Sequence, residues 1–175
     1  MNEENVKKLL DAFPRLYAEC RLPATQSCMG RGFEVQDGWF QIIWDLSERL
    51  EAFFQELPVD KQRPEGCRED GAFVYTAAQC KEKFGTLRYY MSGSTDKMEE
   101  AISEAEKKSA VTCEFCGADG KLRRGGWLLT LCDKCYEKNE ARKKADLAKY
   151  GLAEKVVEES AEKTADKAVE KSAES

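Results

Sequence analysis

The sequence predicts an α+β protein in which a short antiparallel β-sheet is packed by helices and is followed by a small four-cysteine zinc ribbon and a flexible C-terminal tail. Three observations lead to this fold class. Apolar residues recur at helical spacing over 39–57, two short segments rich in β-branched and aromatic residues flank Gly85, and two Cys-x2-Cys pairs come after residue 112. The 175 residues suffice for one domain with a core and a small appendage.

The N-terminal segment 1–35 is expected to form a helix and a loop. Its apolar residues follow helical spacing over 5–19, with Pro14 as an interruption, and turn-forming residues dominate from Pro23 onward. The next segment, 36–110, is expected to be the α+β core. Asp37 is predicted to be the N-cap of its long helix, whose apolar stripe stops at Pro58.

A β-hairpin is predicted from 72–81 and 86–91, with Gly85 between the two strands. Strict alternation would place Ala77 and Lys81 on one face and Cys80 on the other. A second core helix is expected over 96–109, because a narrow apolar stripe repeats there.

The cysteine module occupies 111–136, and its ligands are predicted to be Cys113, Cys116, Cys132 and Cys135. Each Cys-x2-Cys pair can form a tight turn that directs two thiolates at one point, and the 15 residues between the pairs let them converge as a tetrahedron. Four thiolates leave no position for water or substrate, so we expect a structural Zn²⁺. Of the remaining cysteines, Cys80 is expected to be buried, and a second metal site at Cys20 and Cys28 would need distant partners.

Beyond the cysteines, a charged helix is predicted over 137–150 and a disordered tail over 151–175. The tail is dominated by Ala, Glu, Lys, Ser and Val and has no aromatic residue. Such a composition cannot bury enough apolar surface to offset the entropy of ordering the chain.

Composition restricts the classes of function. The net charge of −5 argues against a surface that is a nucleic-acid footprint throughout, although a local basic patch remains open. The chain has no histidine, which removes the commonest general base and every catalytic arrangement that needs one. We therefore predict a protein that is not an enzyme. No stretch approaches the ~20 apolar residues of a membrane span, and we expect a cytoplasmic protein without a membrane partner.

Basic and aromatic side chains gather at the hairpin and in the loop between the cysteine pairs. A cation can bind phosphate and an aromatic ring can stack on a base, so these residues are candidates for binding an anionic ligand. The alternative is ordinary strand packing with solvated lysines at the hairpin end. The predicted ligand-binding residues are Lys81, Lys83, Arg88, Tyr90, Arg123, Arg124 and Trp127.

Three motifs occur in a characteristic order: Asp37-Gly38-Trp39, the run 81–90 (KEKFGTLRYY), and the cysteine pairs with Gly125-Gly126-Trp127-Leu128 between them. This order resembles a group of small uncharacterised zinc-knuckle proteins encoded by bacteriophages and prophages. The resemblance covers roughly 33–135. It implies phage origin, and hence a bacterial host cell as the location, and it implies no particular activity.

Three functions follow as hypotheses. The first is a non-enzymatic binding protein that holds an anionic ligand, either nucleic acid or a nucleotide signal of host defence, and so interferes with the host. The second is a protein–protein inhibitor or adaptor that docks on a host protein, because exposed aromatic residues with arginine often anchor interfaces. The third, a Mg²⁺-dependent nuclease, would need only carboxylates and a lysine.

Overall fold

A computed structural model describes residues 1–59, 61, 62 and 73–149. The chain divides into two compact units, Met1–Cys135 and a second that begins at Tyr136. The first unit holds the sheet, three helices and the cysteine module, and the second holds most of the helix α4 (Asp133–Lys149). The predicted tail over 151–175 lies outside the described residues.

The sheet of the first unit has three strands in the order β1-β2-β3. Strands β2 (Thr76–Lys83) and β3 (Thr86–Ser92) form the predicted antiparallel hairpin, and β1 (Phe33–Glu34) pairs with β2 in parallel. The α+β class is therefore confirmed. The parallel strand was not predicted, since two residues are too short to produce an alternation pattern.

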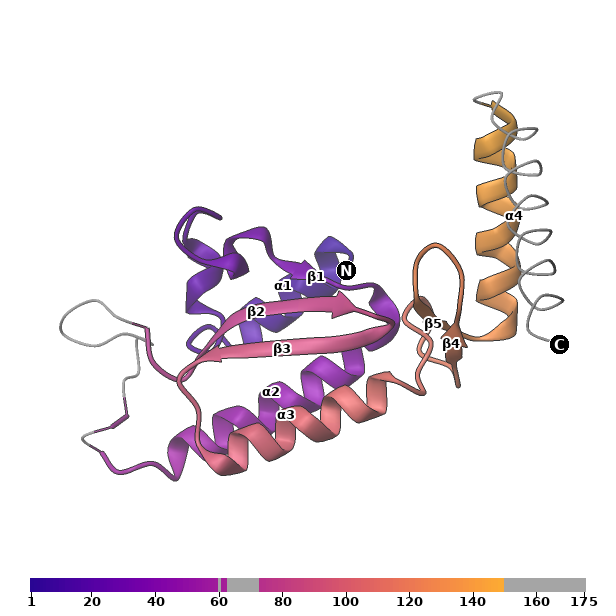
Figure 1. Cartoon of the computed structure of the whole chain (residues 1–175). Helices are drawn as coiled ribbons and strands as arrows, with labels where there is room; N and C mark the ends of the chain where they lie inside the picture. Colours follow the sequence, from indigo (N-terminus) through magenta and orange to yellow (C-terminus); the bar gives the residue numbers. More distant parts are fainter. Residues whose placement is uncertain (60, 63–72, 150–175) are drawn as a thin grey trace, which may run out of the picture. The chain divides into compact units, whose positions relative to one another are not determined.

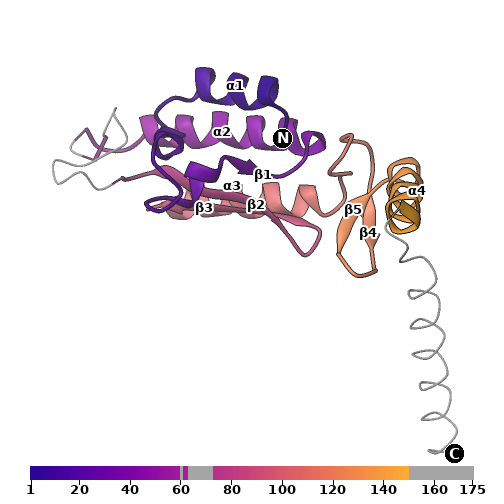
Figure 2. The ribbon, with the colours of Figure 1, turned by 90° about the horizontal axis from the view of Figure 1, so that it is seen from above.

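Three helices accompany the sheet (Figure 1). They are α1 (Glu3–Ala12), α2 (Phe40–Gln55) and α3 (Asp96–Ser109), of which α3 has the predicted bounds. Helix α2 covers one face of the hairpin with α1 beyond it, and α3 runs beside α2 along strand β3 (Figure 2). The side chains of Ser109 and Glu106 accept hydrogen bonds from backbone amides of β3, so α3 covers this edge of the sheet.

Apolar residues from all these elements form one core. The N-terminal segment contributes Leu9, Leu16 and Tyr17. Trp39, which directly precedes α2, is buried in the same core. Helix α1 ends two residues before Pro14, and a 3-10 helix (Ala18–Arg21) replaces the last part of the predicted helix. Proline explains the end of the helix, because it removes an amide donor and restricts the residue before it.

Asp37 is not the N-cap of α2. It begins a short 3-10 helix (Asp37–Trp39), and its carboxylate accepts hydrogen bonds from the amide of Asn2 at 2.8 Å and from the side chain of Asn5 at 3.1 Å. These donors come from the first turn of α1, which sequence reasoning could not place beside Asp37. The side chain therefore joins the N-terminus to the core.

A β-bulge interrupts the alternation of strand β2. Ala77 pairs with Met91 and Gln79 pairs with Tyr90, which leaves Ala78 as the extra residue. As a consequence Ala77 and Cys80 are both buried, and the prediction that they lie on opposite faces was wrong. The burial of Cys80 itself is confirmed.

A buried carboxylate joins the N-terminal segment to the hairpin. Glu19 accepts hydrogen bonds from three hydroxyl groups, which belong to Ser27 at 2.6 Å, Thr76 at 2.7 Å and Ser92 at 2.5 Å. These donors come from a loop and from both long strands. Buried charge is tolerated only where such hydrogen bonds replace water.

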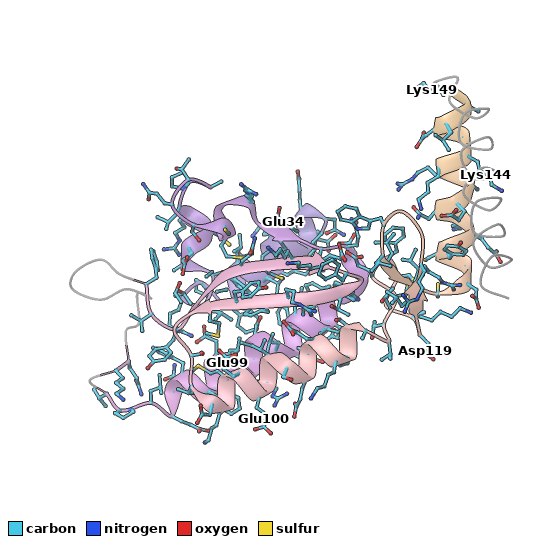
Figure 3. All side chains as sticks on the ribbon, viewed as in Figure 1. Glu34, Glu99, Glu100, Asp119, Lys144 and Lys149 are labelled. Carbon is cyan, nitrogen blue, oxygen red and sulfur yellow. The ribbon has the colours of Figure 1, made fainter. Side chains whose placement is uncertain are left out.

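Replacing this carboxylate is expected to destabilise the whole first unit. Glu19→Ala should lower the free energy of unfolding by about 2–6 kcal/mol, because the buried hydroxyls of Ser27 and Thr76 lose their acceptor and each such loss costs about 1–3 kcal/mol. The control is Glu100→Ala on α3, whose side chain points away from the sheet (Figure 3) and whose loss should change stability by less than about 0.5 kcal/mol. Urea denaturation measures both, and equal midpoints for the two variants would contradict the role of Glu19.

Candidate metal centre and adjoining pocket

The four cysteines predicted as zinc ligands meet at one point. They are Cys113 and Cys116, before strand β4 (Lys121–Arg123), and Cys132 and Cys135, after strand β5 (Leu129–Leu131). Their sulfurs all lie within 4.8 Å of one another, close enough to bind one metal ion. The cluster is therefore a candidate metal centre.

The local backbone explains how the sulfurs converge. The amide of Gly117 donates to the carbonyl of Cys113 at 2.9 Å, and Gly117 has a φ of 78°, a conformation that glycine adopts without strain. The Sγ atoms of Cys116 and Cys132 are 3.7 Å apart, well beyond the ~2.05 Å of a disulfide bond. The backbone amide of Cys135 donates to Cys132 Sγ, and this hydrogen bond together with the neighbouring thiols lowers the pKa of Cys132 to about 7, whereas burial raises the pKa of Cys135.

The first cysteine turn is held against the segment before α2. The amide of Gly38 donates to the carbonyl of Glu114 at 2.8 Å, and the indole of Trp39 donates to the carbonyl of Thr112 at 2.9 Å. A Cβ on Gly38 would lie 2.2 Å from the carbonyl oxygen of Cys113. Only glycine allows two backbones to approach this closely.

Glu114 lies inside this contact and is buried. One carboxylate oxygen accepts from the amide of Gln36 at 3.2 Å, and the other has no hydrogen-bond partner among the residues that the structure describes. Burial raises the pKa of Glu114 to about 7, and the nearby charge of Glu82 adds to the rise.

The second contact of the cysteine module is with the tip of the β2–β3 hairpin. The hydroxyl of Thr130 on β5 donates to the carbonyl of Gly85 at 2.6 Å. One carboxylate oxygen of Glu82 accepts from the amide of Gly85 at 2.6 Å, and the other accepts from the indole of Trp127 at 3.2 Å. Glu82 therefore links the hairpin turn to the loop between β4 and β5.

A cavity of about 530 Å³ lies between the hairpin tip and the β4–β5 loop. Two large aromatic side chains border it, Phe84 at 65% exposure and Trp127 at 67%. We call this cavity the tip pocket. Its lining residues are Lys81, Glu82, Lys83, Phe84, Gly126, Trp127 and Leu128.

The structure brings only part of the predicted ligand-binding set to this pocket. Lys81, Lys83 and Trp127 line it, and Tyr90 lies next to Lys81, whose Nζ is 5.8 Å from the centre of the tyrosine ring. Arg124 is exposed and does not line the pocket.

The two other predicted arginines have structural partners. Arg88 donates to the carbonyl of Leu87 at 2.8 Å and lies 3.5 Å from Glu106. Arg123 donates to the carbonyl of Leu131 at 3.1 Å and pairs with Asp133 at 2.5 Å. Both guanidinium groups thus join elements of the fold. The sequence did not indicate these contacts, because Glu106, Leu131 and Asp133 lie 8 to 18 residues from the arginines that they bind.

Phe84 is the aromatic residue of the pocket that was not among the predicted ligand-binding residues. It and Gly85 occupy the two central positions of the hairpin turn with φ values of 57° and 78°, which is typical of a type I′ turn. Asparagine or aspartate is preferred at the first of these positions, and a bulky residue there is strained by roughly 1–2 kcal/mol. The sequence already contained an indication of this residue, because Phe-Gly occupies a two-residue hairpin turn where Asn-Gly is common.

Comparison with models of protein families, with curated proteins and with solved structures gives no match for this chain. Among the described residues, no helix combines the length and the apolar character needed to cross a membrane.

The close contact at Gly38 is expected to be sensitive to a single methyl group. Gly38→Ala should lower the free energy of unfolding by at least about 2 kcal/mol, since the new Cβ would meet three backbone atoms within 2.6 Å and backbone cannot rotate away. Gly125→Ala is the matched control, because no atom of the described part of the chain lies within 4 Å of its Cβ position. Thermal unfolding compares the two variants, and a neutral Gly38→Ala would show that the two segments do not touch.

Proposed function

We propose that the four cysteines bind a structural Zn²⁺. Tetrahedral Zn²⁺ with bonds of about 2.3 Å needs sulfurs roughly 3.8 Å apart, and the Cys116–Cys132 distance of 3.7 Å fits this requirement. Four thiolates form a closed site with no position for water, so the ion would hold the two cysteine turns together and take no part in chemistry.

The metal assignment can be tested by a cysteine exchange. Mass spectrometry of the metal content should find one zinc per chain in the wild type and none in Cys116→Ser, because three thiolates and a hydroxyl form a much weaker site. Cys28→Ser, which removes an exposed cysteine outside the cluster, should keep the zinc. A wild-type protein that is free of metal and melts at the same temperature after chelation would contradict the assignment.

We propose that the protein works by binding, without catalysis, and that the tip pocket receives an anionic ligand that carries a planar ring. The observation that supports this proposal is the position of two exposed rings, Phe84 and Trp127, on a cavity that also contains Lys81 and Lys83. The planar ring of the ligand would stack on Phe84 or Trp127. The phosphate or carboxylate of the ligand would form ion pairs with the ammonium groups of Lys81 and Lys83.

Charge and strain both favour this use of the pocket. Within the described part of the chain, neither Lys81 nor Lys83 forms an ion pair, so both charges are available to a ligand. The carboxylate of Glu82 is already engaged with Gly85 and Trp127. Phe84 is held in a strained conformation while its ring remains exposed, so packing does not explain its presence, and strain of this kind is common at binding sites.

A nucleotide or nucleic acid is the ligand class that combines ring and charge in this way. The resemblance to phage and prophage zinc-knuckle proteins suggests a setting in which the protein removes a nucleotide signal of host defence or binds nucleic acid to interfere with the host. The chain has no histidine, which fits a role in binding.

Docking on a host protein is the second candidate, because the exposure of Phe84 and Trp127 also suits a protein interface. The first candidate is favoured because the rings border a cavity with two cations in it, whereas an interface anchor usually fills a pocket of its partner.

Substitutions in the tip pocket are expected to weaken nucleotide binding without unfolding the protein. Trp127→Ala should reduce the affinity for ribonucleoside 5′-monophosphates about 5- to 100-fold, since stacking on an aromatic ring contributes about 1–3 kcal/mol. Lys83→Ala should reduce it by about 3- to 10-fold, and Lys107→Ala on α3 is the matched control with no effect. Isothermal titration calorimetry with each of the four monophosphates measures these changes.

Two results would contradict the nucleotide proposal. One is a wild-type protein that binds none of the four monophosphates at millimolar concentration. The other is a stoichiometric complex with a host protein that is lost in Trp127→Ala, which would establish the docking alternative.

A further inference from the structure

The face of the hairpin that points away from α2 is open. Along β2 and β3, the side chains toward the helices are buried, as for Cys80, Leu87 and Tyr89, whereas those on the other face are half-buried or exposed. Figure 1 shows this face toward the viewer, with α2 behind the sheet. The open-face residues of the two strands are Gln79, Lys81, Lys83, Thr86, Arg88 and Tyr90.

Tyr90 is the third exposed aromatic residue in this region, at 46% exposure. Its ring centre is 5.8 Å from Nζ of Lys81, and Lys81 also lines the tip pocket. One lysine therefore connects the pocket with the open face. Along this surface the rings of Trp127 and Phe84 come first, then the ammonium groups of Lys83 and Lys81, and then the ring of Tyr90. We call this series of residues the path.

Acidic residues lie among these cations, and Glu82, which lines the tip pocket, is engaged with Gly85 and Trp127. Arg88 is directed toward Glu106 at 3.5 Å, and the carboxylate of Glu34 lies on β1 in register with Lys81. These two acids border the path on either side, which leaves Lys81 and Lys83 as its central cations.

We propose that the tip pocket and the open face together bind single-stranded nucleic acid, with Tyr90 as a second stacking position. This inference rests on the proposed function of the pocket and specifies its ligand. Exposed rings select for unpaired bases, since the base faces of a duplex are already stacked on one another.

The spacing of these residues along β3 favours a single strand of nucleic acid over a free nucleotide as the ligand. Strand residues rise about 3.4 Å each, so Tyr90 lies roughly 14 Å along β3 from Thr86, where the turn ends. A mononucleotide whose base stacks on Phe84 in the turn cannot place the same base on Tyr90, whereas a chain of several nucleotides can stack one base on each ring. The two lysines can contact about two phosphates of the ligand. For single-stranded nucleic acid, this number of contacts predicts that the logarithm of the binding constant falls with the logarithm of the salt concentration with a slope of about −1.4.

The experiment compares ligands of increasing length. Thymidine 5′-monophosphate, oligothymidylates of two, four and eight residues, and a duplex are titrated by fluorescence anisotropy competition against a labelled octathymidylate. Affinity is expected to rise at least 10-fold from the monophosphate to the octamer. The duplex should bind at least 10-fold more weakly than the octamer.

Substitutions of Tyr90 separate the two sites. Tyr90→Ala should weaken binding of the octamer about 5- to 100-fold and leave the affinity for the monophosphate unchanged. Tyr90→Phe, which keeps the ring and loses only the hydroxyl, should bind the octamer like the wild type. Unchanged thermal unfolding of both variants shows that the fold is intact.

The outcomes distinguish failure of this inference from failure of the pocket proposal. Equal affinity for monophosphate and octamer, or an octamer affinity that Tyr90→Ala leaves unchanged, would contradict binding of single-stranded nucleic acid along the path. Neither result would contradict the proposal that the tip pocket binds a nucleotide. A duplex that binds as tightly as the octamer would also contradict binding of single-stranded nucleic acid along the path. The absence of binding by every ligand, in a calorimetric titration that needs no labelled probe, would remove both proposals.

Discussion

The close approach of Gly38 to the first cysteine turn determines how the cysteine module is joined to the core. Its amide binds the carbonyl of Glu114, and its missing side chain lets the backbone of 113–117 lie against it. Backbone hydrogen bonds are directional, so this contact positions the first cysteine turn relative to the start of α2. The neighbouring Trp39 indole adds a further hydrogen bond to Thr112 while its ring is buried in the core. The cysteine module, which has little apolar core of its own, thus becomes part of the larger domain.

That attachment brings the β4–β5 loop to the hairpin tip. Thr130 and Glu82 bind the backbone of Gly85 from opposite sides, and Trp127 reaches Glu82 from the loop. The tip pocket lies between these two segments, and no single segment forms it. The strained turn at Phe84 is held in place by the same hydrogen bonds, which offset a conformation that a free hairpin would avoid.

The segment Asp37-Gly38-Trp39, the run 81–90 and the two cysteine pairs are far apart in sequence and meet in space. Asp37-Gly38-Trp39 binds the cysteine turn, and Glu82 and Gly85 of the run 81–90 bind the β4–β5 segment. Much of the pattern is therefore explained by packing. Phe84, Lys81 and Lys83 have no such packing role, which is why they carry the functional proposal.

The sequence alone determined the features that depend on local periodicity and spacing. The apolar stripe of α2, the bounds of α3, the hairpin around Gly85 and the grouping of the four cysteines all follow from residues close to one another in the chain. Tertiary structure decided the rest: the two-residue strand β1, the bulge at Ala78, the partners of Asp37 and Arg88, and the pocket. Each of these depends on contacts between segments distant in sequence. Such contacts leave no periodic signal, because their geometry exists only once the core has formed.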